Sequence, residues 1–314
     1  MVILGTPDLY HTPVMLPEAL EGLRVREGGR YVDANLGEGG HAAAVLARGG
    51  HVLGIDADPD AVSVARDRIA VEAPEAADRF AAVNANFREI AAVVEEHGWS
   101  GVDGVLFDLG LSSRQLEASE RGFSFQRHDP LDMRFNPADE VTAADIVNTY
   151  SRDSLADLIY KYGGERRSRQ IATAIIRARP LRTSAELAQA IARGSGPGGG
   201  RGIHPATRTF QALRIAVNDE LNALETALDQ AVKLLDSGGR LVVISYHSLE
   251  DRMVKSLMRT ESSDSISAPE TVTGWRPHER QLRMVHRGVM RPGMEEVNQN
   301  PRSRSARMRI AEKI

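Results

Sequence analysis

The 314-residue chain contains no cysteine. Disulfide bonds, zinc sites built from thiolates and cysteine nucleophiles are therefore all excluded. No apolar run is long enough to span a bilayer, and the opening segment MVILGTPDLY lacks the basic start and apolar core of a secretory signal. We therefore expect a cytoplasmic protein without a membrane segment.

An excess of basic residues is also absent, because the net charge is only −4. The charge is unevenly distributed: residues 1–110 carry 8 basic and 18 acidic side chains, whereas residues 275–314 carry 10 basic and 4 acidic ones. A phosphate-binding edge and a solvated basic surface both fit this C-terminal segment. The hydrophobic content of 42% is enough for one large core and a second, smaller domain.

The most informative stretch is residues 31–56, YVDANLGEGGHAAAVLARGGHVLGID. A short apolar run ends in Asp33, a glycine-rich turn follows, and the alanine-rich residues 41–48 predict a helix that ends at two glycines. A second apolar run ends in Asp56. Strand, glycine turn, helix, strand and acid form the βαβ layout of nucleotide-binding folds, in which the acid binds ribose hydroxyls.

The order of acid and glycines in this stretch discriminates between ligands. A dinucleotide site places G-x-G-x-x-G directly after the strand, so that a pyrophosphate lies on the helix N-terminus. Here Asp33 comes first, which suits the ammonium group of S-adenosylmethionine, a ligand without a pyrophosphate. We therefore favour S-adenosylmethionine; NAD remains the alternative, as does an Asp33 that only caps the turn.

Alternating predicted strands and helices continue to residue 109 and indicate a parallel, doubly wound α/β sheet. Ligands of such sheets bind at the carboxyl ends of the strands. Side chains that fall at this edge are those of Asp33, Asp56, Phe87 and Asp108.

The pattern changes after Gly110. Residues 116–204 contain no convincing strand and predict a helical insertion, with a mobile glycine-rich loop over residues 194–202. We assign residues 1–115 and 205–314 to the sheet domain. Further expected elements are helices at 143–148, 154–162, 167–177 and 184–192, one long helix from 205 to about 236, and strands at 240–246, 281–285 and 306–311, with a flexible polar segment at 259–273.

Several long motifs together resemble one family. They are HTPVML (11–16), DANLGEGGH (33–41), GIDADP (54–59), FDLGLSSRQL (107–116), RGFSF (121–125), PLDMR (130–134), HPATRTFQALRIAVNDEL (204–221), VISYHSLEDR (243–252) and NPRSRSARMR (300–309). The chain resembles, over nearly its whole length, the bacterial ribosomal small-subunit methyltransferase H family (RsmH, formerly MraW).

This resemblance implies a class I S-adenosylmethionine-dependent methyltransferase core, Rossmann-like, with an inserted helical domain for substrate recognition. It also implies an activity: methyl transfer to N4 of one decoding-centre cytidine in 16S rRNA, within the small ribosomal subunit. The oligomeric state stays open, with a homodimer as one alternative.

The resemblance further implies a set of cofactor contacts. They are Gly39, Gly40, His41, Asp56, Phe87, Asp108 and Gln115. Asp56 would hold the ribose hydroxyls and Phe87 would lie near the adenine. Arg114 stands where many members have proline, a departure in the loop that presents Gln115.

The absence of cysteine agrees with a nitrogen target. Cytosine C5 is methylated through a cysteine adduct, whereas exocyclic N4 needs only orientation and an acceptor for its hydrogens. As N4 attacks the sulfonium methyl, positive charge develops on nitrogen, and a nearby carboxylate stabilises it. Asp108 is the first candidate for this catalytic role, and Asp132 and His247 are second candidates.

Other interpretations stay open for some residues. His247 could equally be a strand-end histidine satisfied by the backbone. Arg166, Arg167 and Arg169 fit phosphate contacts and a solvated helix face equally well. At the level of the whole chain, the alternatives to a methyltransferase are a nicotinamide-dependent oxidoreductase and a ribosome-assembly factor that binds RNA without turnover.

Overall fold

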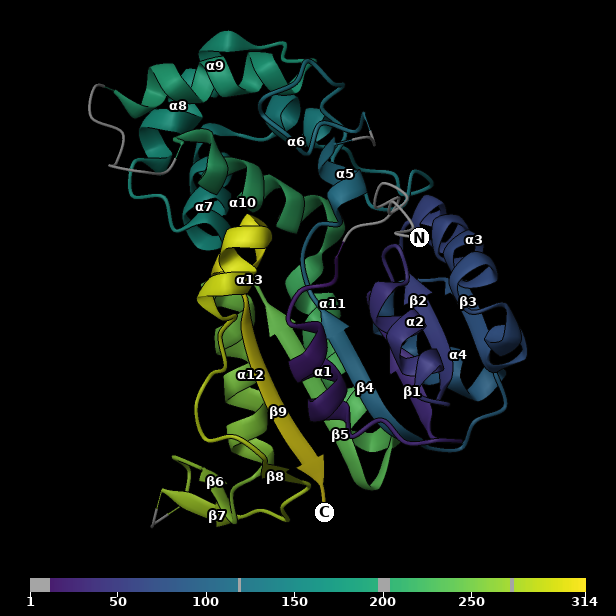
Figure 1. Ribbon diagram of the computed structural model, residues 1–314. Coiled ribbons are helices and arrows are strands. Elements are labelled where there is room, and N and C mark those ends of the chain that lie inside the picture. The colour runs from purple at the N-terminus through teal and green to yellow at the C-terminus, as the bar shows by residue number, and fades with distance from the viewer. Residues whose placement is uncertain (1–11, 118–119, 197–203, 272–273) are drawn as a thin grey trace. The chain divides into compact units, whose positions relative to one another are not determined.

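The computed structural model describes residues 12–117, 120–196, 204–271 and 274–314 (Figure 1). The chain divides into two compact units, residues 1–110 with 223–314, and residues 111–222. No helix within the described ranges is long and apolar enough to cross a membrane. His11 and residues 197–202, which belong to a predicted motif and to the predicted mobile loop, lie outside the described residues.

The first unit is built on a seven-stranded sheet (Figure 1). Its strands are β1 (Arg30–Asp33), β2 (His51–Asp56), β3 (Phe80–Asn84), β4 (Val102–Asp108), β5 (Leu235–Ser245), β8 (Leu282–Met284) and β9 (Arg307–Lys313). They lie in the order β3-β2-β1-β4-β5-β9-β8; the pairs from β3 to β5 are parallel, and β9 runs antiparallel to both β5 and β8. This arrangement confirms the predicted Rossmann-like, doubly wound α/β class.

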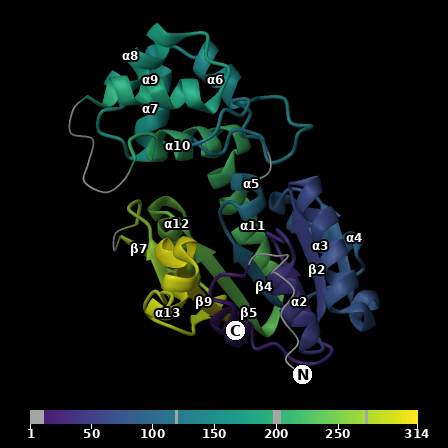
Figure 2. The same ribbon diagram turned by 45° about the horizontal axis from the view of Figure 1, so that its top comes forward.

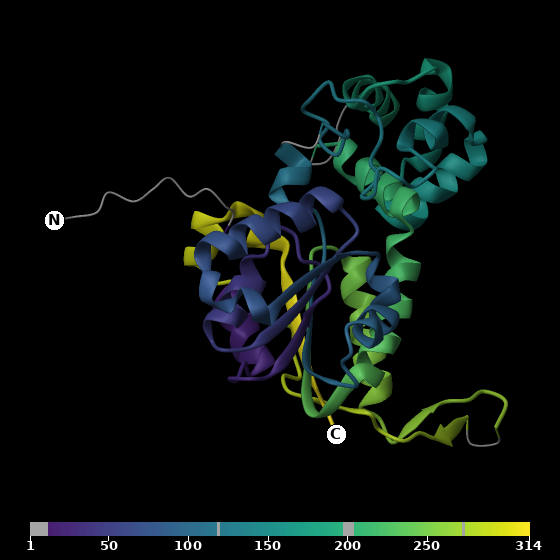
Figure 3. The same ribbon diagram turned by 90° about the vertical axis from the view of Figure 1, so that its right-hand side faces the viewer.

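Helices cover both faces of the sheet (Figure 3). One face packs against α1 (Leu16–Leu23), α2 (Gly40–Ala47) and α3 (Pro59–Glu72), and the other against α4 (Ile90–Glu96), α11 (Glu220–Leu234) and α12 (Ser248–Glu261). Because successive side chains of a strand point to opposite faces, Leu106 of β4 lies in one core while Val105 and Phe107 lie in the other. Burial on both faces explains why these strands read as continuous apolar runs.

Shorter elements complete this unit. They are η1 (Pro74–Arg79), η2 (Phe87–Glu89), β6 (Ser265–Ser267), β7 (Trp275–Pro277), α13 (Met294–Gln299) and η3 (Pro301–Ser305). The expected flexible segment at 259–273 is largely ordered: α12 runs to Glu261, and β6 pairs with β7 in a two-stranded hairpin (Figure 3). Three-residue strands with mixed polarity give too short a pattern to predict from sequence.

The second unit is helical (Figure 2). Its helices are α5 (Ser113–Glu117), α6 (Ala143–Thr149), α7 (Arg152–Gly163), α8 (Ser168–Ala178), α9 (Ser184–Ser195) and α10 (Ala206–Asn218). Thr142 and Thr183 begin α6 and α9 with capping boxes, in which each threonine and the acid three residues later satisfy each other's backbone N–H groups. The helices share one core that includes Ile146, Leu155 and Leu187.

The predicted single helix from 205 to about 236 is wrong. Asp219 adopts a left-handed conformation with φ 49° and separates α10 from α11. Tertiary bonds hold this break: the Asn218 side-chain amide donates to the Met133 carbonyl at 2.8 Å, and its oxygen accepts from the Phe135 N–H at 2.7 Å. Phe210 and Leu213 of α10 belong to the helical core, so this unit extends from 111 to 222, beyond the predicted boundaries of 116 and 204.

Candidate functional site

The carboxyl edge of β1, β2 and β4 brings three acids of the sheet unit to neighbouring strand ends. Asp33 ends β1, Asp56 ends β2 and Asp108 ends β4. The strands are in register, since Asp33 pairs with Gly54 on one side and with Leu106 on the other. The sheet topology therefore places these three side chains at one edge, as the sequence predicts.

Asp56 organises the glycine turn. Its Oδ2 accepts a hydrogen bond from the Gly37 N–H at 2.8 Å, and its Oδ1 accepts one from the Asp58 N–H at 2.9 Å. Gly37 and Gly39 have φ values of +52° and +75°, which glycine adopts without strain. The acid after the second strand thus couples β2 to the turn that follows β1.

Gly39 and Gly40 also have packing reasons to lack a side chain. A Cβ on Gly40 would lie 2.3 Å from Pro13 Cγ, and a Cβ on Gly39 would lie 3.1 Å from Ala65 Cβ. Gly39 is the N-cap of α2 and offers no capping side chain, so the first turn of this helix has no side-chain acceptor. The glycine turn is therefore packed closely against Pro13, and the N–H groups in the first turn of α2 have no side-chain acceptor.

His41 lies at the centre of a buried group of ionisable side chains. Only 6% of it is exposed, and only 4% of Asp33 is. His41 Nε2 lies 3.4 Å from Asp108 Oδ2. Among the residues that the structure describes, Asp33 Oδ2 and both ring nitrogens of His41 have no hydrogen-bond partner. Unsatisfied buried polar atoms are uncommon in proteins, and they point to a function for this group.

Burial dominates the electrostatics here. It raises the pKa of Asp33 to about 7, although nearby His41 lowers it in part. Burial lowers the pKa of His41, but the carboxylates of Asp108 and Asp33 raise it by more, so it lies above its usual value.

Tyr246 binds the candidate catalytic acid and was not singled out from the sequence. Its hydroxyl donates a hydrogen bond of 2.8 Å to Asp108 Oδ1. Burial and the adjacent Asp108 carboxylate raise the pKa of Tyr246 well above its usual value, so the phenol stays protonated. Gly110, at φ +120°, gives the ring its room, since a Cβ there would lie 3.0 Å from Tyr246 Cδ2. The sequence feature that could have indicated Tyr246 is its position directly after β5, the strand that pairs with β4.

Phe87 lies in η2, just after β3, and is half-buried. Its ring packs edge to face on Phe107, with centroids 6.0 Å apart and planes at 82°. Asn84, at the end of β3, donates to the Asp56 carbonyl at 2.9 Å and so fixes the neighbouring strand end. Phe87 therefore follows β3 at the carboxyl edge, where the sequence predicts it, and its proximity to a ligand base stays a prediction.

His247 begins α12 as its N-cap. Its Nδ1 accepts from the Glu250 N–H at 3.4 Å, and its Nε2 lies 3.0 Å from Glu250 Oε1. Glu250 in turn accepts the N–H groups of Tyr246 and His247. These contacts favour the structural interpretation of His247, which holds the start of α12, over a role in a base pocket.

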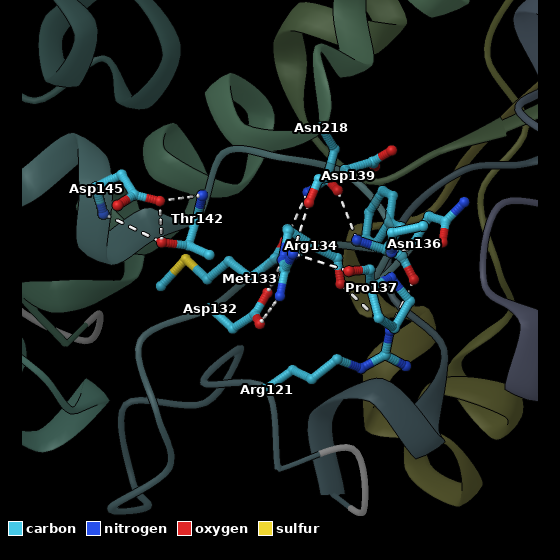
Figure 4. A network of polar contacts seen from close by, with 12 residues as sticks. Arg121, Asp132, Met133, Arg134, Asn136, Pro137, Asp139, Thr142, Asp145 and Asn218 are labelled. Carbon is cyan, nitrogen blue, oxygen red and sulfur yellow. Dashed lines mark hydrogen bonds and ion pairs between the residues drawn. The ribbon is translucent and has the colours of Figure 1, made fainter.

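Asp132 lies in the helical unit, where Arg134 occupies both of its oxygens (Figure 4). Arg134 Nε and Nη2 donate to Oδ1 and Oδ2 at 2.8 and 2.7 Å, and Nη1 donates to the Pro137 carbonyl at 2.8 Å. Burial raises the pKa of Asp132, but Arg134 lowers it by more, so it lies below the usual range. Through these contacts the Asp132 carboxylate stabilises the loop around Met133, whose φ is +63°.

Gln115 also lies in the helical unit, on α5, and is buried. Its side-chain oxygen accepts from the Ser112 N–H at 3.1 Å, while the Ser112 hydroxyl accepts from the Gln115 N–H at 3.1 Å. The predicted cofactor contacts Gly39, His41, Asp56, Phe87 and Asp108 thus share one unit, whereas Gln115 belongs to the other.

Part of the basic C-terminal segment is neutralised within the sheet unit. Arg309 Nε and Arg307 Nη1 donate to Asp251 at 2.8 and 3.1 Å, and Arg309 is only 8% exposed. Burial raises the pKa of Asp251, but the two guanidinium groups lower it by more, to below its usual value. These two arginines therefore tie β9 to α12, and the excess of positive charge does not by itself indicate a phosphate-binding edge.

Comparison with known proteins agrees with the geometry. The MraW methylase family model matches residues 8–314. A protein named ribosomal RNA small subunit methyltransferase H, from Dehalococcoides mccartyi, is 52% identical over 307 residues, which cover 97% of this chain and 86% of the relative. One of the same name from Thermomicrobium roseum is 51% identical over 310 residues, 97% of this chain and 94% of the relative.

Among solved structures, an rRNA methylase from Streptococcus thermophilus aligns over 100% of this chain and 99% of its own, with a TM-score of 0.44 and 10% identity, a likeness too weak to add to the argument. The family match covers nearly the whole chain, including the glycine turn, Asp56 and Asp108. The chain therefore belongs to the MraW methylase family, and its methyl donor is S-adenosylmethionine, as the sequence predicted.

Proposed function

We propose that this protein methylates rRNA of the small ribosomal subunit in the cytoplasm, at the exocyclic N4 of a specific decoding-centre cytidine of 16S rRNA. Relatives that are about half identical over the whole chain carry the name of a small-subunit rRNA methyltransferase. The observation that carries the nitrogen target is Asp108, a carboxylate at the carboxyl end of β4 whose orientation the Tyr246 hydroxyl fixes.

The residues present fit S-adenosylmethionine. Asp33 Oδ2 is a buried carboxylate oxygen without a partner among the described residues, which suits the ammonium of the methionine end. The first turn of α2, with Gly39, Gly40 and His41, suits the adjoining carboxylate because its N–H groups lack a side-chain cap. Asp56 would bind the ribose hydroxyls and Phe87 would lie against the adenine.

The bound cofactor would supply an electrophilic methyl group on a sulfonium. Asp108 would accept a hydrogen bond from the attacking N4, orient its lone pair and stabilise the positive charge that develops on nitrogen. One N4 proton then leaves to the carboxylate, so that the product is the neutral N-methyl base. Tyr246 keeps Asp108 in one rotamer and, since its own pKa is raised, does not compete for that proton.

The test is methyl transfer to defined substrates. Purified protein, labelled S-adenosylmethionine and small subunits lacking the modification should yield label in 16S rRNA that nucleoside analysis identifies as N4-methylcytidine. Naked 16S rRNA in parallel reactions shows whether the assembled particle is required. Label on C5 or on another base, or no label in the rRNA, would overturn the proposal.

Replacing Tyr246 by phenylalanine removes one hydroxyl and leaves the ring against Gly110. Loss of a hydrogen bond to a carboxylate, worth about 1.5 kcal/mol, is expected to lower kcat roughly tenfold with little change in cofactor affinity. Single-turnover methylation at saturating cofactor measures this rate. An unchanged rate would show that Asp108 is held adequately without the hydroxyl.

A further inference from the structure

The helical unit carries a surface hollow between α7 and α8 that the cofactor site does not use. Its volume is about 520 Å³, and its lining includes Tyr160 and Asp157 from α7, Arg166 and Arg167 just before α8, and Arg169 in the first turn of α8. This size falls within the range of about 300–1,000 Å³ typical of sites for small molecules, so one nucleotide unit fits it.

Several other arginines of the helical unit are paired with acids, unlike those of this hollow. Arg134, Arg208 and Arg214 each face a carboxylate within the unit. Arg166 and Arg169 are exposed and form no ion pair with any residue that the structure describes. The Arg167 guanidinium donates to the Ser195 carbonyl, a neutral acceptor. Three cations thus face one acid, Asp157, around the hollow.

Such clustering has an energetic cost in the isolated protein. Like charges separated by three residues repel one another, and solvent and salt reduce this repulsion without reversing its sign. An anionic ligand reverses the sign, because guanidinium groups bind phosphate oxygens in a planar, two-pronged geometry. The cluster therefore favours a polyanionic partner.

Tyr160 indicates which polyanion. It is 62% exposed. Val141 and Tyr150, two other exposed large hydrophobic residues of this unit, are 45% and 40% exposed. An exposed aromatic ring beside a basic groove is the combination with which proteins bind single-stranded nucleic acid, by stacking on a base while cations follow the backbone. An acidic protein would use the arginines but would not need a stacking surface.

We infer that the hollow lined by Tyr160, Arg166, Arg167 and Arg169 is a binding surface for single-stranded RNA, with arginines on phosphates and the tyrosine ring on a base. This inference rests on the proposed rRNA substrate and assigns part of its recognition to the helical unit. It requires no contribution from the residues at the carboxyl edge of the sheet.

The test uses the full chain with Arg166→Gln and Arg169→Gln combined, and separately with Tyr160→Ala. Arg167 is kept because it also holds the end of α9 through Ser195. The matched control combines Arg177→Gln with Arg193→Gln, which removes two exposed arginines of α8 and α9 that do not line the hollow. Circular dichroism and calorimetric titration with S-adenosylmethionine verify that fold and cofactor affinity are unchanged.

Fluorescence anisotropy with a labelled single-stranded 16S rRNA fragment, titrated at several salt concentrations, is the decisive measurement. Loss of two phosphate contacts should reduce the slope of log K against log salt by about 1.4, since each contact to a single strand contributes about 0.7. Tyr160→Ala should weaken binding about tenfold or more without changing the slope, and the control should leave both quantities near wild type.

The inference about the hollow is overturned if the double variant keeps the wild-type slope while the wild type still methylates small subunits, or if the control has the same effect as the double variant. Unchanged RNA binding with weakened methylation of assembled subunits would assign the hollow to a ribosomal protein instead. A wild-type protein that binds no RNA would overturn the proposed function together with the inference.

Discussion

Asp108→Asn is expected to lower kcat by about 10²-fold while leaving the affinity for S-adenosylmethionine nearly unchanged. Asparagine keeps the size and an acceptor oxygen for the Tyr246 hydroxyl, whose bond to Asp108 Oδ1 is 2.8 Å. It removes the negative charge that would face the positive charge developing on N4. An interaction made mainly in the transition state affects the rate, whereas a contact to bound cofactor affects affinity.

Single-turnover methylation at saturating cofactor, together with calorimetric cofactor affinity, separates these two roles. Asp103→Asn is the matched control, because Asp103 lies near the opposite end of the same strand, where it accepts from the Arg30 N–H at 2.8 Å. A near-normal rate with weakened cofactor binding would make Asp108 a cofactor contact only. The search for the acceptor would then return to Asp132 and His247, although their present contacts are structural.

The second large effect concerns Asp33 and the pH dependence of stability. Its pKa in the folded protein is about 7, against an ordinary value of 3.8, because the carboxyl is buried. Between these values the folded chain binds more protons than the unfolded chain, so stability falls as pH rises. From pH 5 to pH 8 this group alone should lower the free energy of unfolding by about 2–3 kcal/mol.

Asp33→Asn removes that dependence. In urea unfolding of the cofactor-free protein, the variant should gain stability relative to wild type as pH rises from 5 to 8. Its affinity for S-adenosylmethionine should fall by about 1.5–3 kcal/mol at pH 8, where wild-type Asp33 is ionised and can pair with the ammonium. Parallel pH profiles for the two proteins would contradict the buried charge, and equal cofactor affinities would contradict the ammonium assignment.

Strand ends and the glycine turn could be predicted from sequence because they depend on local patterns. The apolar runs that end in Asp33 and Asp56 form β1 and β2, and the observed strands end at these two acids. In a parallel sheet, the end of a strand fixes the edge at which its last side chain lies. Asp33, Asp56 and Asp108 could therefore be placed together without knowledge of any contact.

Contacts between distant segments could not be predicted. Tyr246 meets Asp108 across 138 positions of sequence, and no periodicity encodes this pair. The break at Asp219 depends on hydrogen bonds that join Asn218 to Met133 and Phe135, more than 80 positions away. The local sequence pattern does not contain these bonds and therefore predicts one uninterrupted helix. Asp132 looked available for catalysis because its sequence motif does not show that the arginine two residues later binds both carboxylate oxygens.

The position of β9 has a consequence for the chain during its synthesis. β9, residues 307–313, follows β5 and β8 in sequence, yet it lies between them and pairs with both. Until these residues have emerged, β5 exposes an unpaired edge, and the cores on both faces lack Met308, Ile310 and Ala311. We expect the nascent sheet to remain open, and prone to association through that edge, until residues 307–313 have been synthesised.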